Sequence, residues 1–249
     1  NPQSYPQKLW ETSVSILLTK QTFTISLFMT KVVAWSDNNK VVEQYRRNGM
    51  FQASASLAEQ IAQHLGEQII RGELTPGERI QELRIASELE VSRGSVREAL
   101  LLLERRHLIE ILPRRGATVQ DLTESQVRSL YEIMQILLGL VVRKAIRAMK
   151  EEELDPFIEL IHLLQEQAND KDVENFFIHS FRFIRLFYPY ANNPYVADML
   201  QNLEPALQRC YYIAIHLNET EIKECLAFFK AIIETIFRRD PRSALEIIR

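Results

Sequence analysis

The sequence has little cysteine, glycine or proline: 2 Cys, 7 Gly and 9 Pro in 249 residues. Cys210 and Cys225 cannot build a disulfide framework, so we expect two buried thiols and a reducing, cytoplasmic setting. So few glycines and prolines argue against a loop-rich or low-complexity chain. Lys20 and Lys31 interrupt the apolar stretch 13–35. This leaves no run near the roughly 18 residues that span a bilayer, and we expect no membrane partner.

The sequence also lacks the patterns that mark common catalytic sites. It contains no HExxH, no Gly-x-Ser-x-Gly, no glycine-rich phosphate loop and no cluster of Cys and His at ligand spacing. We therefore predict that the protein is not an enzyme. Its formal net charge of -3 gives no global sign of a nucleic-acid partner, but a local basic surface does not depend on the net charge.

The first fifty residues differ from the rest. Residues 13–35 are rich in Thr, Ile, Val, Phe and Leu, which is more typical of strands than of helices. The sequence begins with Asn, and Met29 and Met50 could each serve as a start. We interpret residues 1–50 as an N-terminal extension that is poorly ordered and outside the folded unit.

Residues 51–120 have the pattern of three helices followed by a β-hairpin. Apolar residues recur every fourth position over 57–69 and predict an amphipathic helix that stops at Gly72. A short helix over 81–89 and a third over 93–107 follow. Two β-prone runs then flank the sequence PRRG, which suits a hairpin tip. This order of elements is that of a winged helix-turn-helix.

Residues 121–249 have helical patterns almost throughout. Thr123 is the expected N-cap of the first helix, which runs to about Met149. Further helices are expected at about 152–168, 173–188, 194–216, 219–238 and from 242 onward. The last of these indicates either a truncated or a short final helix. We therefore predict a mainly α protein, with an N-terminal winged helix-turn-helix followed by an all-α helical bundle.

The start of the third helix carries groups that suit contact with DNA. Ser92 and Ser95 can donate to phosphate oxygens, and the free backbone N–H groups of a helix N-terminus favour an anion. Gly94 has no side chain, so the backbone can approach DNA closely. Arg93 and Arg97 are four residues apart on one face, where either can make a bidentate contact to guanine.

At the hairpin tip, Arg114 and Arg115 can reach the minor groove or the flanking backbone. The alternative is that these arginines are ordinary solvated surface, because residues 57–120 hold nine Arg and ten Glu. Most of the glutamates, however, fall outside the segments expected to face DNA, and Glu98 is the exception. Those outside are Glu59, Glu67, Glu73, Glu78, Glu82, Glu88, Glu90, Glu104 and Glu110. We therefore predict a local basic surface on a domain that is not basic as a whole.

Three segments also carry a family resemblance: IRGELTPGERI (70–80), VSRGSVREALLLLE (91–104) and RRGATV (114–119). With the residues between them, they resemble the DNA-binding domain of the GntR family of bacterial transcription regulators over residues 57–119. The resemblance implies a homodimer on a palindromic operator of double-stranded DNA. The contacts that it implies are Arg84, Arg93, Gly94, Ser95, Arg97, Arg114, Arg115 and Gly116.

The helical remainder resembles the effector-binding, dimer-forming FCD domain of the FadR subfamily, most clearly in FRFIRLFYPYANNPYV, residues 181–196. Relatives there bind a divalent metal through an Asp and three His. Aligned on the Asn-Pro pair at 193–194, the resemblance places Ser180 at the Asp and Ile184 at a His, and Phe229 falls at another His. None of these three side chains is a metal ligand, so we predict no metal and no cofactor.

Two positions on the first helix of this domain depart from the subfamily as well. Met134 and Leu138 stand where many relatives carry an Arg and a Glu, and an anionic metabolite would want that Arg. Together with Ser180, Ile184 and Phe229, they predict an apolar effector pocket. Either this pocket binds a more apolar effector, or side chains fill it and it senses nothing.

We therefore expect a cytoplasmic, dimeric regulator that binds DNA sequence-specifically and represses transcription until a small-molecule effector releases it. The alternative is a ligand-independent dimeric regulator with a filled, metal-free helical domain. A metabolite that binds the native state raises the melting temperature, which distinguishes the two.

Overall fold

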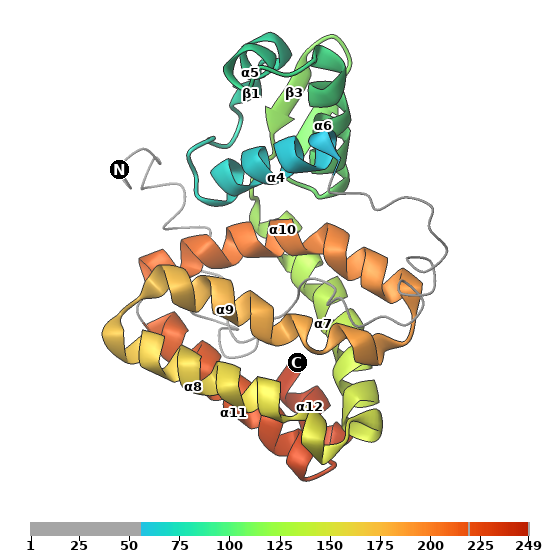
Figure 1. Ribbon diagram of the computed structural model, residues 1–249, viewed down its shortest axis with the longest axis vertical. Coiled ribbons are helices and arrows are strands. Elements are labelled where there is room, and N and C mark those ends of the chain that lie inside the picture. The colour runs from blue at the N-terminus through green and yellow to red at the C-terminus, as the bar shows by residue number, and fades with distance from the viewer. Residues whose placement is uncertain (1–55, 219, 249) are drawn as a thin grey trace.

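The computed structural model describes residues 56–218 and 220–248, which form two regions with separate hydrophobic cores. The expected extension over residues 1–50 lies outside the described residues. Figure 1 shows the smaller region, which contains the sheet, above a larger bundle of helices.

The smaller region has the winged helix-turn-helix fold that the sequence predicts. Leu65, Ile85 and Leu103, one from each helix, are at most 4% exposed in its core. Its elements are α4 (Leu57–Ile70), β1 (Arg79–Ile80), α5 (Glu82–Glu88), α6 (Arg93–Arg105), β2 (Ile109–Leu112) and β3 (Gly116–Val119).

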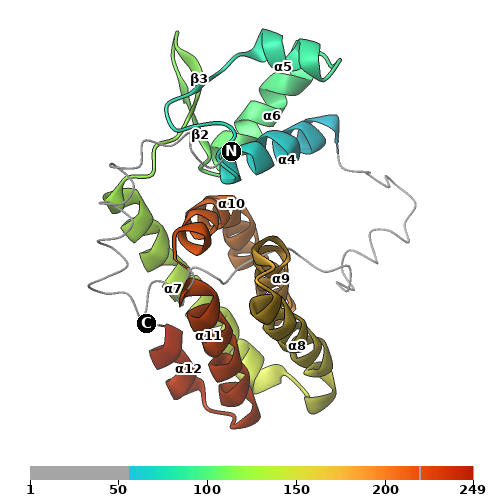
Figure 2. The same cartoon turned by 90° about the vertical axis from the view of Figure 1, so that its left-hand side faces the viewer.

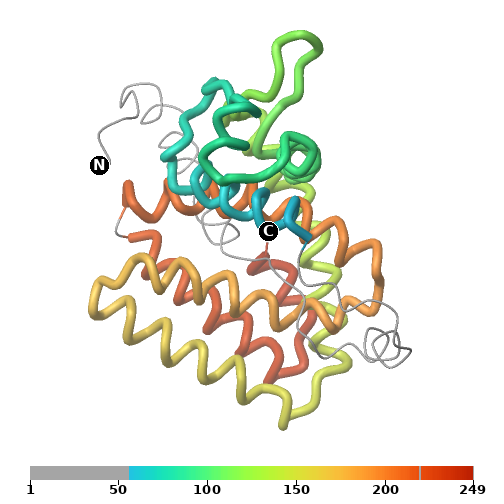
Figure 3. Tube along the Cα trace, turned by 45° about the horizontal axis from the view of Figure 1, so that its top comes forward, coloured from blue at the N-terminus to red at the C-terminus, as the bar shows by residue number. Residues whose placement is uncertain are grey.

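The wing is the hairpin of β2 and β3, which belongs to a three-stranded antiparallel sheet. The hairpin register places Leu112 opposite Gly116, and β1 pairs with the other edge of β3, so the strand order is β1-β3-β2. Figure 3 shows the hairpin projecting from the molecule. The sequence predicted the hairpin but not β1, because a two-residue strand has no alternation to detect.

The larger region is the helical bundle that the sequence predicts. Its first helix begins with a capping box in which Thr123 and Gln126 bond reciprocally. Two boundaries differ by three residues. α8 begins at Asp155, after a 3-10 turn where the helix was expected to start, and α9 ends at Arg185, before a short 3-10 turn where the helix was expected to continue. Among the described residues, no helix is long and apolar enough to cross a membrane. The elements are α7 (Glu124–Ala148), η2 (Glu151–Glu153), α8 (Asp155–Asp170), α9 (Val173–Arg185), η3 (Tyr188–Ala191), α10 (Pro194–Leu217), α11 (Thr220–Phe237) and α12 (Pro241–Ile248).

Aromatic side chains fill the centre of the bundle. The ring of Phe183 on α9 lies 4.3 Å from that of Phe229 on α11, and Phe157 on α8 lies 4.7 Å from Phe187. These rings belong to one apolar cluster to which α7, α8, α9, α10, α11 and α12 all contribute. Figure 2 shows α10 between α4 and the remaining helices of the bundle.

The two regions pack directly against each other, because α4 lies across α10 (Figures 1 and 2). Arg71 at the end of α4 pairs with Glu174 of α9 at 2.7 Å, and Arg105 of α6 pairs with Asp198 of α10 at 2.7 Å. The side chain of Ile70 belongs to the apolar core of the bundle. The smaller region is therefore docked on the bundle and not merely linked to it.

Candidate nucleic-acid interface and effector domain

The start of α6 is a capped and accessible helix N-terminus. The N-cap Ser92 accepts a hydrogen bond through its Oγ from the backbone N–H of Ser95 at 3.1 Å. The two serine hydroxyls lie 2.9 Å apart, which leaves one hydroxyl proton to donate outward. The backbone N–H groups of Arg93 and Gly94 have no acceptor within the helix. This N-terminus therefore presents donors and the positive end of the helix dipole to an anion such as a phosphate.

Arg93 and Arg97 project from this helix with side chains 53% and 61% exposed. Both point toward one carboxylate: Glu82 Oε2 lies 2.8 Å from Arg97 Nε and 3.6 Å from Arg93 Nη2. Glu82, which was expected to lie outside the DNA-facing segments, is therefore in contact with two of the arginines predicted to bind DNA. Glu82 begins α5, which packs against α6. The Glu82 carboxylate therefore lies between the two guanidinium groups and neutralises part of their positive charge.

The other predicted arginine contacts lie on α5 and on the wing. Arg84 is exposed and lies 3.6 Å from Glu88, one turn along α5, which makes a weak surface pair. Arg114 and Arg115 are exposed at the hairpin tip. α5, the start of α6 and the tip of the wing lie on the side of the molecule away from the bundle (Figures 1 and 2). The fold therefore groups the predicted contacts, and their contact with DNA remains a prediction.

The two glycines among the predicted contacts have different structural roles. Gly116 has φ +80°, a conformation that strains other residues, so the hairpin itself needs this glycine. Gly94 is helical, and a Cβ there would meet only Ser92 Oγ at 3.6 Å, an ordinary contact. Because the fold does not require a glycine at position 94, its presence favours a role in the close approach of DNA.

Gly94→Ala is expected to weaken operator binding several-fold while the melting temperature stays the same or rises slightly. Alanine is favoured over glycine in a helix by about 1 kcal/mol, and by less near an end, and the free protein has room for the methyl group. A duplex docked against the helix start would meet that methyl group. Fluorescence anisotropy with operator DNA and thermal unfolding measure the two effects. Wild-type operator affinity in this variant would contradict close backbone approach.

Arg79 is a further exposed cation near the wing, and the sequence did not indicate it. It lies on β1, and its Nη2 and Nε are 3.6 and 3.7 Å from the point that a Cβ on Gly116 would occupy. The segment IRGELTPGERI contains this arginine. Only the pairing of β1 with β3, which sets Arg79 opposite Thr118, places it beside the wing.

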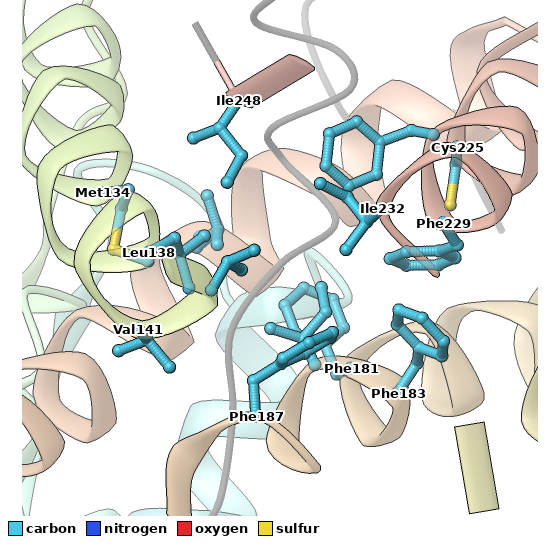
Figure 4. Close-up of a cluster of buried hydrophobic side chains, with 14 of the residues drawn as sticks. Met134, Leu138, Val141, Phe181, Phe183, Phe187, Cys225, Phe229, Ile232 and Ile248 are labelled. Atoms are coloured by element: carbon cyan, nitrogen blue, oxygen red, sulfur yellow. The ribbon is translucent and has the colours of Figure 1, made fainter. Parts of the chain in front are cut away.

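The residues predicted to line an effector pocket all lie in the core of the bundle. Figure 4 shows Met134 and Leu138 of α7 on one side of this core and Phe229 of α11 on the other, with further apolar side chains around them. Each of the five residues is at most 2% exposed: Met134, Leu138, Ser180, Ile184 and Phe229. Side chains therefore occupy the positions where the resemblance places the effector.

The three positions that would hold the subfamily's metal do not fit such an ion. Ser180 Oγ lies 3.8 Å from Cys225 Sγ. Ile184 is an alkyl side chain that is 2% exposed, and the ring of Phe229 packs on that of Phe183. These side chains supply none of the imidazole or carboxylate donors that such an ion prefers.

His179, the neighbour of Ser180, does not replace the missing ligands. Its ring Nδ1 lies 2.8 Å from the carbonyl oxygen of Asn175 and 2.9 Å from Gln167 Nε2, and the residue is half-buried. Within the described parts of the chain, no three His, Cys, Asp or Glu side chains are grouped to hold a metal ion. The lack of a metal stays a prediction, and the apolar side chains at the expected ligand positions support it.

Burial keeps Tyr131 and Cys210, two ionisable groups inside the bundle, in their neutral forms. Tyr131 is 1% exposed, and its hydroxyl has no hydrogen-bond partner among the described residues. Burial raises the pKa of Tyr131 well above its usual value, and Cys210 and Glu221 raise it further. Burial also raises the pKa of the Cys210 thiol to about 12. Cys210 and Cys225 are both buried thiols that form no disulfide within the described residues, as predicted.

These features together define a class of protein. A winged helix-turn-helix with exposed arginines at a capped recognition helix, docked on an all-helical domain, is a DNA-binding transcription regulator. Residues 57–119 match "Bacterial regulatory proteins, gntR family", and residues 129–249 match the "FCD domain". The chain belongs to the GntR family, and its FCD domain agrees with the predicted FadR-like subfamily.

The curated relatives that match the chain are regulators. It is 26% identical over 180 residues to the gluconate operon transcriptional repressor of Bacillus licheniformis, which covers 72% of each chain. It is 27% identical over 177 residues to the HTH-type transcriptional repressor RspR of Escherichia coli, covering 70% of this chain and 78% of the relative. It is 27% identical over 190 residues to the HTH-type transcriptional regulator McbR of Escherichia coli, and the match covers 74% of this chain and 84% of McbR. These names agree with the prediction that the protein is not an enzyme.

Solved structures share the same fold. Escherichia coli McbR/YncC superposes with a TM-score of 0.63 at 23% identity, covering 78% of this chain and 92% of that one. A putative GntR regulator from Rhodococcus sp. RHA1 gives 0.58 at 20% identity with the same two shares. These similarities establish the fold of both regions.

Proposed function

We propose that this transcription regulator works as a homodimer on a palindromic operator and represses until a small-molecule effector binds it. The observation that carries the proposal is the capped start of α6, which presents Arg93 and Arg97 on one exposed face. Such a helix reads one major-groove half-site, and a two-fold dimer reads two that are about 34 Å apart or a multiple of this. The two relatives named as repressors support the direction of control. Since the chromosome is its target, we place the protein in the cytoplasm.

Selection of bound fragments from the source genome tests this function. The expected result is a set of fragments that share an inverted repeat, with half-sites one helical turn or a multiple of it apart. Fragments without a common sequence would contradict sequence-specific binding. A single, unrepeated half-site bound by one chain would contradict the dimer.

A ligand-independent regulator is the second candidate, and the closed core of the bundle favours it. The predicted pocket residues, Phe229 among them, are all buried, and under this alternative the bundle only dimerises. Thermal unfolding with a panel of metabolites separates the two candidates, because a ligand of the native state raises the melting temperature. Elemental analysis of undialysed protein, in which we expect no stoichiometric divalent ion, tests the loss of the metal.

A further inference from the structure

A cavity of about 750 Å³ lies between the DNA-binding domain and the bundle. α4 forms one wall from Glu59 to Arg71, and α9 and α10 form the other. Its volume falls in the range of small-molecule sites, which often lie at domain interfaces. This cavity is separate from the core positions that the family resemblance assigns to an effector.

The wall formed by α9 has an apolar stripe that ends in a cation. Phe177, Ile178, Phe181 and Arg185 all line the cavity. Phe181 follows Phe177 by four residues and Ile178 by three, and Arg185 follows Phe181 by four, which places the four side chains on one face of the helix. Ile178 is 49% exposed despite its apolar side chain. From Phe177 to Arg185 the stripe is about 12 Å long, at about 1.5 Å per residue.

Among the polar groups that line the cavity, Arg185 has a hydrogen-bond donor without an acceptor among the described residues. Its Nη2 pairs with Glu204 Oε1 at 3.2 Å, while its Nε is buried and has no hydrogen-bond partner among the described residues. The carboxylates that line the cavity are engaged: Glu204 also accepts from Gln208 at 2.9 Å, Glu67 accepts from Gln63 at 3.2 Å, and Glu59 pairs with Arg106. A buried polar atom without a partner is uncommon, and this one is a donor beside an apolar surface.

A second buried polar group without a partner in the described parts of the chain, the hydroxyl of Tyr188, lies near the ion pair of Arg185 and Glu204. Tyr188 is 2% exposed, and its hydroxyl has no partner among the described residues. Burial raises the pKa of Tyr188 well above its usual value, Glu204 raises it further and Arg185 lowers it. The environment of Arg185 is therefore rich in donors that lack acceptors.

We propose that this interdomain cavity binds a small carboxylate with an apolar body, and that this ligand is the effector. The carboxylate accepts hydrogen bonds from Arg185, because a planar guanidinium matches the geometry of a carboxylate. The apolar body lies along Phe181, Ile178 and Phe177. The inference rests on the proposed effector-controlled function and places the effector between the domains.

A ligand in this cavity would act directly on the docking of the DNA-binding domain. It would touch α4, which packs against α6 in the same core, and it would touch α9 and α10 of the bundle. A ligand shifts an equilibrium by its differential affinity for the two states. A ligand that binds more tightly to one docking of α4 on α10 therefore favours that docking. In a dimer, this would change the distance between the two α6 helices and with it the affinity for the operator.

Calorimetric titration of the full chain with 4-phenylbutanoate tests the site, since this probe joins a carboxylate to an apolar body of suitable length. We expect saturable binding of one molecule per chain. The neutral alcohol and the cationic amine of the same skeleton should bind at least tenfold more weakly. Arg185→Gln should weaken carboxylate binding at least tenfold, and Ile178→Trp, which places a large ring on the part of the stripe where the apolar body would lie, should also weaken it at least tenfold. The matched control is Arg182→Gln on the exposed side of α9, which should bind as the wild type does.

Equal carboxylate affinity in Arg185→Gln and wild type would overturn the proposal, as would equal affinity for the alcohol or the absence of saturable binding. A photoreactive 4-phenylbutanoate provides a readout that does not depend on a variant: cross-links to α4, α9 or α10 support the site, and cross-links confined to α7 and α11 overturn it. Operator binding is measured on the same samples. If the wild type binds the operator selectively but does not bind the carboxylate, only this inference is overturned. If the wild type does not bind the operator selectively, the proposed function is overturned.

Discussion

Arg97→Ala is expected to weaken binding to the selected operator by about 1–3 kcal/mol, which is roughly a 5- to 150-fold rise in Kd. The Arg97 side chain is 61% exposed on α6 and is oriented by Glu82 at 2.8 Å. Its removal takes away the predicted bidentate base contact and also leaves the Glu82 carboxylate less neutralised at the predicted DNA surface. Fluorescence anisotropy with the operator and with a scrambled duplex measures both affinity and discrimination.

Two further variants separate base reading from charge. Arg97→Lys keeps the charge but not the planar pair of donors, so discrimination between operator and scrambled duplex should fall while the salt dependence changes little. Arg128→Ala removes a surface arginine of α7 that pairs with Glu124, and it should leave operator affinity unchanged. Wild-type operator affinity in Arg97→Ala would remove Arg97 from the set of base contacts.

The helices of this protein could be predicted because their signals are local. A cap such as Ser92 or Thr123 and the apolar spacing that follows lie within a few residues of the boundary they define. The hairpin was equally local, since PRRG lies between its two strands. The end of α9 was placed late because Leu186 and Phe187 continue the apolar pattern beyond the last helical turn.

The arrangement between elements could not be predicted in the same way. Glu82 and Arg97 are 15 positions apart, and only the packing of α5 on α6 brings the two side chains into contact. Arg79 reaches the wing through a two-residue strand that no sequence pattern marks. The cavity at Arg185 depends on how α4 docks on α10, and nothing in the spacing of either helix encodes that docking.

The family resemblance located positions in the bundle but could not determine how their side chains pack. It placed Ser180, Ile184 and Phe229 at ligand positions, and chemistry alone argued against a metal there. Whether these side chains leave room for an effector depends on every neighbour in the core. The structure places Ile184 and Phe229 in a continuous apolar cluster with rings from α8 and α9, and Ser180 is buried as well. This is why the interdomain cavity becomes the stronger candidate.

Phe229→Ala is expected to lower the free energy of unfolding by about 3–5 kcal/mol, the usual cost of removing a buried phenylalanine ring. Phe229 is 0% exposed and packs on Phe183 at 4.3 Å, so the lost ring leaves a void in a close-packed core. Urea unfolding followed by circular dichroism measures the change. Phe237→Ala is the control, because that ring lies on the same helix but is 53% exposed, and its loss should change stability by no more than about 0.5 kcal/mol.

The size of that loss also decides between a filled core and a preformed effector pocket at this position. A ring that lines an open pocket gives up fewer contacts when it is removed, so a loss below about 1 kcal/mol would contradict the filled core. A loss in the expected range means that an effector could enter the bundle core only by displacing well-packed side chains. It would then have to supply the free energy of that displacement, a cost that a ligand in the cavity beside Arg185 does not meet.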